Sequence, residues 1–152
     1  MPVELDVQYV VTDQKLLPDN EQLSLWANKA LQGDSSAHIG LRIVGENESQ
    51  NLNHQYRGKD GPTNVLSFPM ELPDDLQESI LGDLVICAPV VEKEAAEQGK
   101  SRDEHWAHMV IHGVLHLQGF DHITDDQADE METLEIKYLE ELGYKNPYIS
   151  NK

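Results

Sequence analysis

The chain has 152 residues, of which 39% are hydrophobic and 26% charged, a composition typical of one globular domain rather than of a disordered or fibrous protein. Its 28 acidic residues against 11 lysines and arginines give a formal net charge of −17, which excludes indiscriminate binding to nucleic-acid backbones. The single cysteine excludes an internal disulfide, and an acidic start without an apolar segment argues against a signal peptide, so we expect a cytoplasmic protein with no membrane segment.

The first half of the chain alternates strand patterns with helix patterns. Apolar and polar residues alternate over residues 3–9 and 39–43, which predicts two half-buried strands. A short strand is predicted at 65–69 and a fourth strand at 80–87. Between the first two strands, "PDNEQLSLWANKALQG" predicts a helix that begins with a capping box of Asp19 and Gln22 and ends at Gly33. Its expected buried stripe is Leu23, Trp26, Ala27 and Ala30. A short polar helix is expected at 46–54, and "YRGKDGPTN" at 56–64 predicts a loop.

The second half has helical patterns only. Pro89 suits a first helical position and Gly99 a C-terminal cap, and a further helix is expected from about 102 to 118. The last helix should begin with a capping box of Thr124 and Gln127. It is expected to bury Ala128, Met131, Leu134, Tyr138 and Leu142. Strands first and helices last, with no linker or repeat, predict a single α+β domain over residues 1–152, with a small mixed sheet of about four strands packed with helices.

Three histidines in "HGVLHLQGFDH", residues 112–122, are candidate metal ligands. His112 and His116 are four residues apart on a predicted helix, so both imidazoles can reach one ion. Gly119 can adopt the left-handed conformation that ends a helix, which would turn the chain and bring His122 to face the pair. The spacing therefore predicts a metal site of three histidines like that of zinc proteases, although a helix with several histidines can also be a polar face.

Two earlier histidines do not fit the same ion. His108 would lie about 12 Å from His116 along the helix axis, too far for a shared metal. We expect His105 and His108 to be structural or solvent-facing, and Asp121 either orients an imidazole or is a surface turn residue. Three imidazoles with no fourth protein ligand would leave a position for water, as in catalytic zinc sites, although nickel, cobalt and copper accept the same ligands.

The residue after the first histidine separates two enzyme classes. Zinc peptidases have a general-base glutamate there, and this chain has Gly113, so a peptidase or other zinc hydrolase would need a carboxylate from elsewhere. Attack on a phosphodiester depends less on a separate base but needs positive charge near the phosphate. Arg57 and Lys59, two cations in the predicted loop, can supply it, although a basic loop residue is often only solvated. Asp83 and Ser67 either line the site or serve the sheet.

These segments together resemble the YbeY family of bacterial single-strand endoribonucleases, also called rRNA maturation factors. The resemblance spans essentially the whole chain and rests on "LN" at 52–53, "YRGKDGPTNVLSFP" at 56–69, "LGDLVI" at 81–86, "HGVLHLQGFDH" and the acidic helix that follows. It implies an α+β sandwich with a four-stranded sheet. It also implies one Zn²⁺ per chain held by His112, His116 and His122, with Arg57 as the functional arginine.

The resemblance further implies cleavage of single-stranded ribosomal RNA, in maturation of the 16S 3′ end and in ribosome quality control. The implied partners are a small-subunit ribosomal protein and an rRNA-associated GTPase. Because the net charge of −17 opposes binding to free RNA, we expect a basic ribosomal protein to dock on the acidic surface while the cleft at Arg57 takes one RNA strand. A ribosome-assembly factor with a mainly structural metal is the alternative. Whether water or the RNA 2′-hydroxyl is the nucleophile stays open.

Overall fold

The computed structural model describes residues 3–10, 17–31, 37–69, 80–120 and 123–148. Its elements follow in the order β1 (Val3–Val10), α1 (Asn20–Ala30), β2 (Ala37–Val44), α2 (Glu46–Arg57), β3 (Val65–Pro69), β4 (Ile80–Cys87), α3 (Ala88–Glu97), α4 (Arg102–Leu117) and α5 (Asp125–Glu141). This is the small α+β fold that the strand and helix patterns predict. No described helix has the length and apolar character needed to cross a membrane.

The sheet has four strands in the order β1-β2-β4-β3. Strands β1, β2 and β4 run parallel, and β3 pairs antiparallel with β4 at one edge. Residues directly opposite one another in such a pair lie on the same face. Ser67 therefore shares a face with its partner Leu84, whereas Phe68 and its partner Asp83 share the other face. The edge strand β3 thus presents different side chains to the two sides of the sheet.

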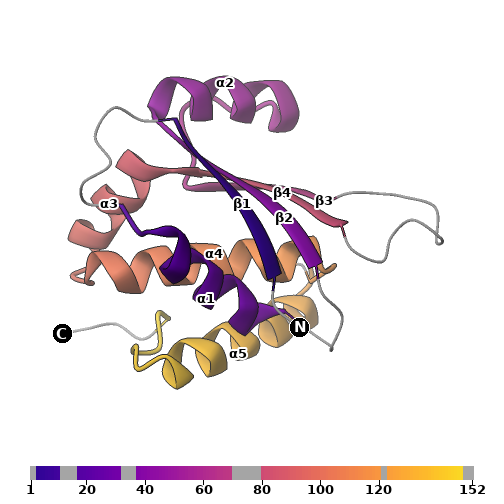
Figure 1. Cartoon of the computed structure of the whole chain (residues 1–152), viewed down its shortest axis with the longest axis vertical. Coiled ribbons are helices and arrows are strands. Elements are labelled where there is room, and N and C mark those ends of the chain that lie inside the picture. Colours follow the sequence, from indigo (N-terminus) through magenta and orange to yellow (C-terminus); the bar gives the residue numbers. More distant parts are fainter. Residues whose placement is uncertain (1–2, 11–16, 32–36, 70–79, 121–122, 149–152) are drawn as a thin grey trace.

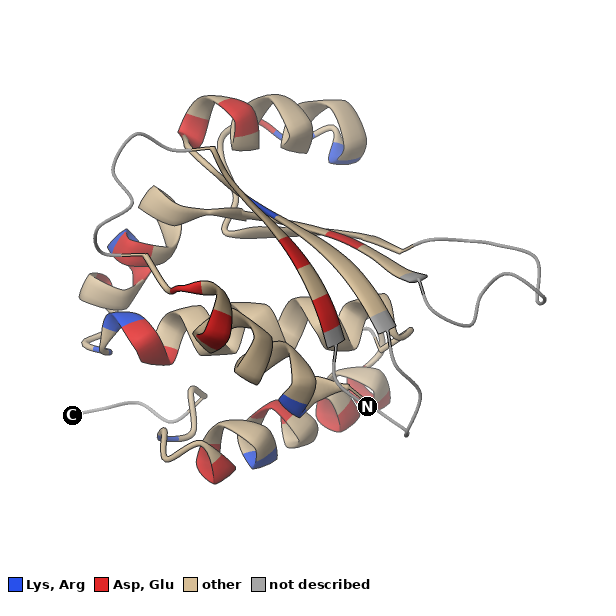
Figure 2. Cartoon of the chain, viewed as in Figure 1, with Lys and Arg blue, Asp and Glu red and all other residues tan. Residues whose placement is uncertain are grey.

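Helices cover both faces of the sheet, as Figure 1 shows. Helices α1 and α4 pack on one face, and α5 packs against α4 on the side away from the sheet. The main core lies between the sheet and these helices, and its largest fully buried side chains include Leu84, Ile86, Trp106 and Ile111. Helix α2 crosses the opposite face over a smaller core of Val44, Leu66, Val85 and Cys87. Figure 2 shows acidic residues spread over β1, α1 and α5 and fewer basic ones.

The predicted helix boundaries hold wherever the signal is local. The capping boxes Asp19–Gln22 and Thr124–Gln127 are both present, and the buried stripe of α1 is the predicted one. Helix α1 ends at Ala30, before the predicted stop, and Gly33 lies outside the described residues. Gly119, after α4, has the predicted left-handed conformation, with φ of +100°.

One prediction about the helices was wrong, and a second was incomplete. Helix α2 continues to Arg57 rather than to residue 54, so Arg57 ends a helix instead of lying in a loop. Gly58 stops the helix with φ of +65°, and its N–H donates to the carbonyl of His54 at 3.0 Å. The predicted buried face of α5 was incomplete rather than misplaced. Met131 is fully buried, and Leu134, Tyr138 and Leu142 are partly buried and pack against the core, but the prediction omitted the fully buried Glu135 and Leu139.

Candidate functional site

A cavity of about 700 Å³ opens between the C-terminal end of α2, strand β3 and helix α4. It is lined by Tyr56, Arg57, Thr63, Asn64, Val65, Leu66, Ser67, Phe68, His112 and His116. The structure therefore brings together three of the four candidate site residues from two distant parts of the sequence. The fourth, His122, lies outside the described residues, as does Asp121. Ser67 lines this cavity, whereas Asp83 faces the other side of the sheet.

Helix α4 carries a ladder of four histidines with nearly equal spacing. Ring centroids are 6.2 Å apart for His105 and His108, 6.4 Å for His108 and His112, and 6.3 Å for His112 and His116. Because the spacing is the same along the ladder, it cannot show which rings bind a metal. Their surroundings differ, since His105 and His108 are buried and only His112 and His116 reach the cavity.

The buried carboxylate of Glu135, on α5, holds the middle of this ladder. Its side chain is 1% exposed, and His112 Nδ1 donates to its Oε2 at 2.9 Å while His108 Nε2 donates to Oε1 at 2.6 Å. The hydroxyl of Tyr148 also donates to Oε1. A histidine whose Nδ1–H is bonded to a carboxylate has its lone pair on Nε2, which is the usual state of a metal-binding imidazole. Glu135 therefore holds His112 in the tautomer that a metal-binding imidazole has.

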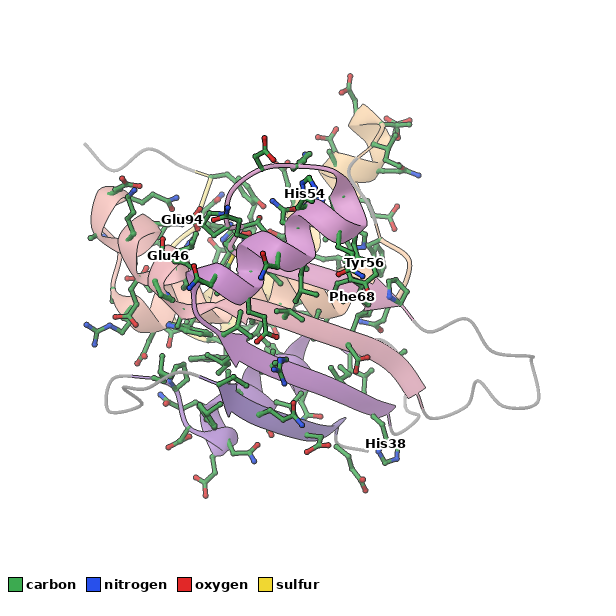
Figure 3. All side chains as sticks on the ribbon, turned by 90° about the horizontal axis from the view of Figure 1, so that it is seen from above. His38, Glu46, His54, Tyr56, Phe68 and Glu94 are labelled. Atoms are coloured by element: carbon green, nitrogen blue, oxygen red, sulfur yellow. The ribbon has the colours of Figure 1, made fainter. Side chains whose placement is uncertain are left out.

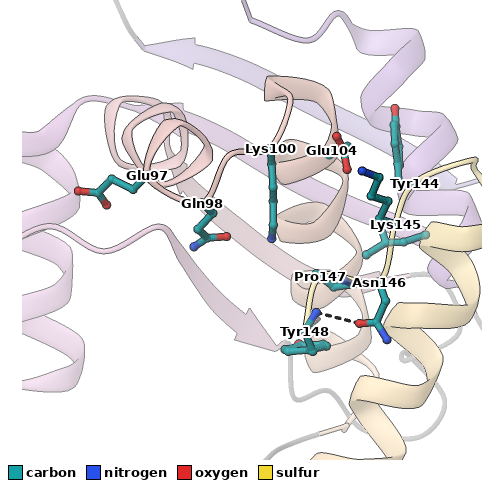
Figure 4. Close-up of a pocket in the computed structure, with 10 residues that line it drawn as sticks. Glu97, Gln98, Lys100, Glu104, Tyr144, Lys145, Asn146, Pro147 and Tyr148 are labelled. Carbon is teal, nitrogen blue, oxygen red and sulfur yellow. Dashed lines mark hydrogen bonds between the residues drawn. The ribbon is translucent and has the colours of Figure 1, made fainter. Parts of the chain in front are cut away.

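Glu135 is ionised in this setting. Burial raises the pKa of its carboxyl, but the hydrogen bonds from His108 and His112 outweigh burial and hold the pKa at about 2. Burial, and then the Glu135 carboxylate, raises the pKa of Tyr148, so its hydroxyl keeps the proton that it donates. Figure 4 shows the C-terminal segment 144–148 that carries Tyr148, beside a separate cavity of about 420 Å³.

His105 belongs to a second, structural arrangement. Its Nε2 donates to Glu94 Oε1 of α3 at 2.8 Å, and Asn64 Nδ2 donates to the same oxygen at 3.1 Å. Asn64 Oδ1 in turn accepts from Val65 N at 2.7 Å, so this arrangement ties the start of β3 to α3 and α4. The structural interpretation of His105 and His108 is thus borne out, and the solvent-facing one was wrong, because both residues are buried.

Buried polar residues of α2 set the position of Arg57. Ser49 Oγ donates to Thr63 O and accepts from Thr63 N, both at 2.9 Å, and Asn53 Nδ2 donates to Gly61 O at 2.9 Å. These bonds hold segment 58–64 against the helix, so the end of α2 stays beside β3 and the cavity. Arg57 itself is exposed, and within the described ranges no acidic side chain forms an ion pair with it. Lys59 is exposed too but does not line the cavity.

The side chains present fit two ligands of a metal ion. Neutral imidazoles are good ligands for zinc, and Glu135 fixes the tautomer that His112 would need. No group of three or more histidine, cysteine, aspartate or glutamate side chains that could hold an ion is found in the part of the chain that the structure describes. The three-histidine site therefore stays a prediction, with His122 as the expected third ligand.

Gly113 explains the absence of a peptidase-like glutamate. It is buried on the face of α4 that meets the sheet, and a Cβ there would lie 2.7 Å from Leu84 Cδ2. The position after His112 therefore points into the core and not into the cavity. A carboxylate there could not act on a substrate in the cavity.

We expect Gly113→Glu to destabilise the protein by more than about 3 kcal/mol, because it combines overpacking with burial of an unpaired charge. Urea unfolding followed by circular dichroism measures the change. Gly45→Glu is the matched control, because a Cβ at Gly45 meets nothing within 4 Å, and it should change the stability by less than about 1 kcal/mol. Casein hydrolysis by the wild type that is lost in His116→Ala would restore the peptidase hypothesis.

The sequence analysis missed Glu135 and Tyr148 and considered only Asp121 as the partner of an imidazole. A signal for Glu135 was present, because it lies four residues after Met131 and four before Leu139, both of which are buried. A buried acidic side chain must be paired, and an adjacent histidine-rich helix is the natural source of partners. No comparable signal pointed to Tyr148.

Comparisons with known proteins agree with the geometry. A family model described as "Endoribonuclease YbeY" matches residues 8–143. The solution structure of TM1509 from Thermotoga maritima is 33% identical in sequence and superposes with a TM-score of 0.60, covering 91% of this chain and 88% of that chain.

Proposed function

Since this chain belongs to the YbeY family of endoribonucleases, which act in ribosomal RNA maturation, we propose that it is a metal-dependent enzyme that cuts single-stranded ribosomal RNA. The observation that supports this most directly is the shared cavity, in which Arg57 from α2 faces the same space as His112 and His116 from α4. We propose the 3′ end of 16S RNA as the substrate in maturation and defective ribosomes as the target in quality control.

The proposed site residues have distinct parts in the reaction. His112, His116 and His122 would hold the ion, for which zinc is our choice. When bound, the ion would act as a Lewis acid toward the phosphate and lower the pKa of a water molecule. Arg57 binds the scissile phosphate with its planar fork of donors and stabilises the negative charge that develops on it. Glu135 keeps His112 in the orientation and tautomer that this task requires.

The charge distribution supports docking on a basic partner. Acidic side chains are spread over β1, α1 and α5 (Figure 2), and such a surface attracts basic proteins and repels RNA. We propose that a small-subunit ribosomal protein binds this surface and delivers the RNA strand to Arg57, and that an rRNA-associated GTPase acts with the complex.

A mainly structural metal, the alternative expected for an assembly factor, has less support. Glu135, His108 and Tyr148 already join α4, α5 and the C-terminal segment through hydrogen bonds that need no ion. A peptidase has less support still, because Gly113 faces the core.

Arg57→Ala tests the proposed function. With a labelled, single-stranded rRNA fragment, we expect kcat to fall by about 100- to 1,000-fold, as for other groups that stabilise charge in a transition state. Unfolding midpoint and metal content should not change, because Arg57 is an exposed residue at the end of α2 and is not a proposed metal ligand.

Lys59→Ala is the matched control, since it removes an exposed cation two residues away that does not line the cavity. It should cut at the wild-type rate, within about threefold. Equal cleavage by all three proteins, purified identically, would mean that the activity is a contaminating ribonuclease and would overturn the proposal.

A further inference from the structure

Two aromatic side chains at the edge of the cavity pack against each other. Tyr56, next to Arg57 on α2, lies with its ring centroid 5.1 Å from that of Phe68 on β3, at an interplanar angle of 73°. Figure 3 shows the two rings beside one another at the C-terminal end of α2. Phe68 is partly buried, whereas Tyr56 is 58% exposed. Packing on Phe68 thus fixes the tyrosine ring while leaving most of its surface accessible.

The pair stands between two cavities. Both rings line the cavity that contains Arg57, His112 and His116, and both also line a second cavity of about 530 Å³. The second cavity lies over the face of the sheet that α2 only partly covers, and strands β1, β2 and β4 form its floor. A molecule bound at the candidate site can therefore reach Tyr56 without any rearrangement of the backbone.

The charges of the second cavity disfavour phosphate. Asp6, Asp83 and Glu48 line it, and Arg42, the one cation among its described lining residues, is already bonded to Glu48 through Nε and through Nη2 at 3.0 Å. Gln8 Oε1 accepts from Arg42 Nη1 at 2.8 Å. Excess carboxylate repels a phosphate group but leaves a flat, neutral nucleobase unaffected. Phosphates are therefore drawn to Arg57, and the surface around Tyr56 suits a base.

Helix geometry places the side chains of Tyr56 and Arg57 on adjoining sides of the same turn of α2. Tyr56 and Arg57 are consecutive, so their Cα atoms are about 3.8 Å apart and their side chains diverge by about 100° around the helix. The Tyr56 ring, which would contact a base, and the Arg57 cation, which would contact its phosphate, therefore project from the same turn of α2 on adjoining sides.

We propose that Tyr56, supported by Phe68, is a stacking platform for the nucleobase adjacent to the phosphate held at Arg57. This inference rests on the proposed function and specifies how that site selects its substrate. A base can leave its neighbours and stack on tyrosine cheaply in a single strand, whereas in a duplex it must first unpair and unstack. Tyr56 therefore selects for single strands. It is tolerant of sequence, because every base has a face that can stack.

The test compares Tyr56→Leu and Tyr56→Phe with the wild type on a single-stranded oligoribonucleotide that carries 2-aminopurine, whose fluorescence is quenched by stacking. Loss of the ring in Tyr56→Leu should raise KM by about 5- to 150-fold, with a smaller effect on kcat, and should abolish the quenching. Tyr56→Phe keeps the ring and should restore both. Leu25→Ala, at an exposed apolar side chain of α1 (56% exposed), is the matched control and should behave as wild type.

The possible outcomes separate this inference from the proposed function. If Tyr56→Leu matches the wild type in KM and in quenching while Arg57→Ala still fails to cut, the platform is overturned and the nuclease stands. If the wild type does not cut but quenches the probe in a Tyr56-dependent way, the platform stands as a binding site and the nuclease falls. Absence of both cleavage and quenching overturns both.

Discussion

His116→Ala is expected to lose both RNA cleavage and tight metal binding while remaining folded. The ring reaches the cavity and is only partly buried, so its removal leaves no large void in the core. Loss of a group that only supports a metal ligand weakens metal binding by roughly 10- to 100-fold. Loss of the ligand His116 itself should therefore weaken it by more than this. Elemental analysis of the purified protein and isothermal titration with Zn²⁺ measure metal binding, and cleavage of a labelled rRNA fragment measures activity. Urea unfolding followed by circular dichroism shows whether the variant is folded.

His54→Ala is the matched control for this variant. His54 is an exposed histidine of α2 whose Nδ1 lies 3.5 Å from the exposed carboxylate of Asp60, and it does not line the cavity. It should keep wild-type metal content and activity. If His116→Ala binds zinc as tightly as His54→Ala, the metal lies elsewhere and the proposed ligand set is wrong. If it loses the metal and unfolds, the ion is structural, as the assembly-factor alternative requires.

Glu135→Leu is expected to be the most destabilising substitution at the site. It leaves His108, His112 and the Tyr148 hydroxyl without their shared acceptor, and loss of one member of a buried charged arrangement costs roughly 3–5 kcal/mol. Glu135→Gln keeps the shape and one acceptor oxygen, so it should fold. Its amide nitrogen cannot accept a hydrogen bond, so one imidazole loses its partner, and Zn²⁺ affinity should fall by about 10- to 100-fold.

A comparison of the wild type with Glu135→Gln shows how the stabilisation by the Glu135 carboxylate depends on pH. The folded-state pKa of Glu135 is about 2, below the ordinary value of 4.5, so its contribution to stability is complete above about pH 4.5 and is lost as the pH falls toward 2. The difference in unfolding free energy between wild type and Glu135→Gln should be largest above pH 4.5 and shrink below it. Urea titrations between pH 7 and pH 3 measure this, and a difference that does not change with pH would contradict the ionised state.

The extent to which the fold follows from the sequence depends on how local each signal is. Strands 65–69 and 80–87 were predicted with the observed boundaries, because each is a short apolar run that ends at or just before a proline, a signal that spans only a few residues. Helix α2 was predicted three residues too short, because its buried side chains include Ser49 and Asn53. Polar residues at those positions carry no hydrophobic periodicity, and their partners in segment 58–64 are known only once the chain has folded.

The residues of the candidate site likewise fall into those that a local sequence pattern predicts and those that only tertiary packing brings together. The spacing of His112 and His116 within one helix is a local pattern, and the sequence was sufficient to nominate them. The carboxylate that holds His112 lies 23 residues away, and the tyrosine that completes the arrangement lies 40 residues from His108. Such pairings arise from the packing of α5 on α4, which no local pattern encodes. Arg57 was nominated correctly for the cavity but in the wrong element, because a helix end and a loop have similar composition.

The position of Glu135 along the chain also orders events during synthesis. A ribosome makes the histidines of α4 first, then the carboxylate of α5, and then Tyr148, so a chain that is still growing has imidazoles with no acceptor to fix their tautomer. The hydrogen-bonded arrangement of His108, His112, Glu135 and Tyr148 can therefore form only after α5 and the following segment have left the ribosome and packed on α4.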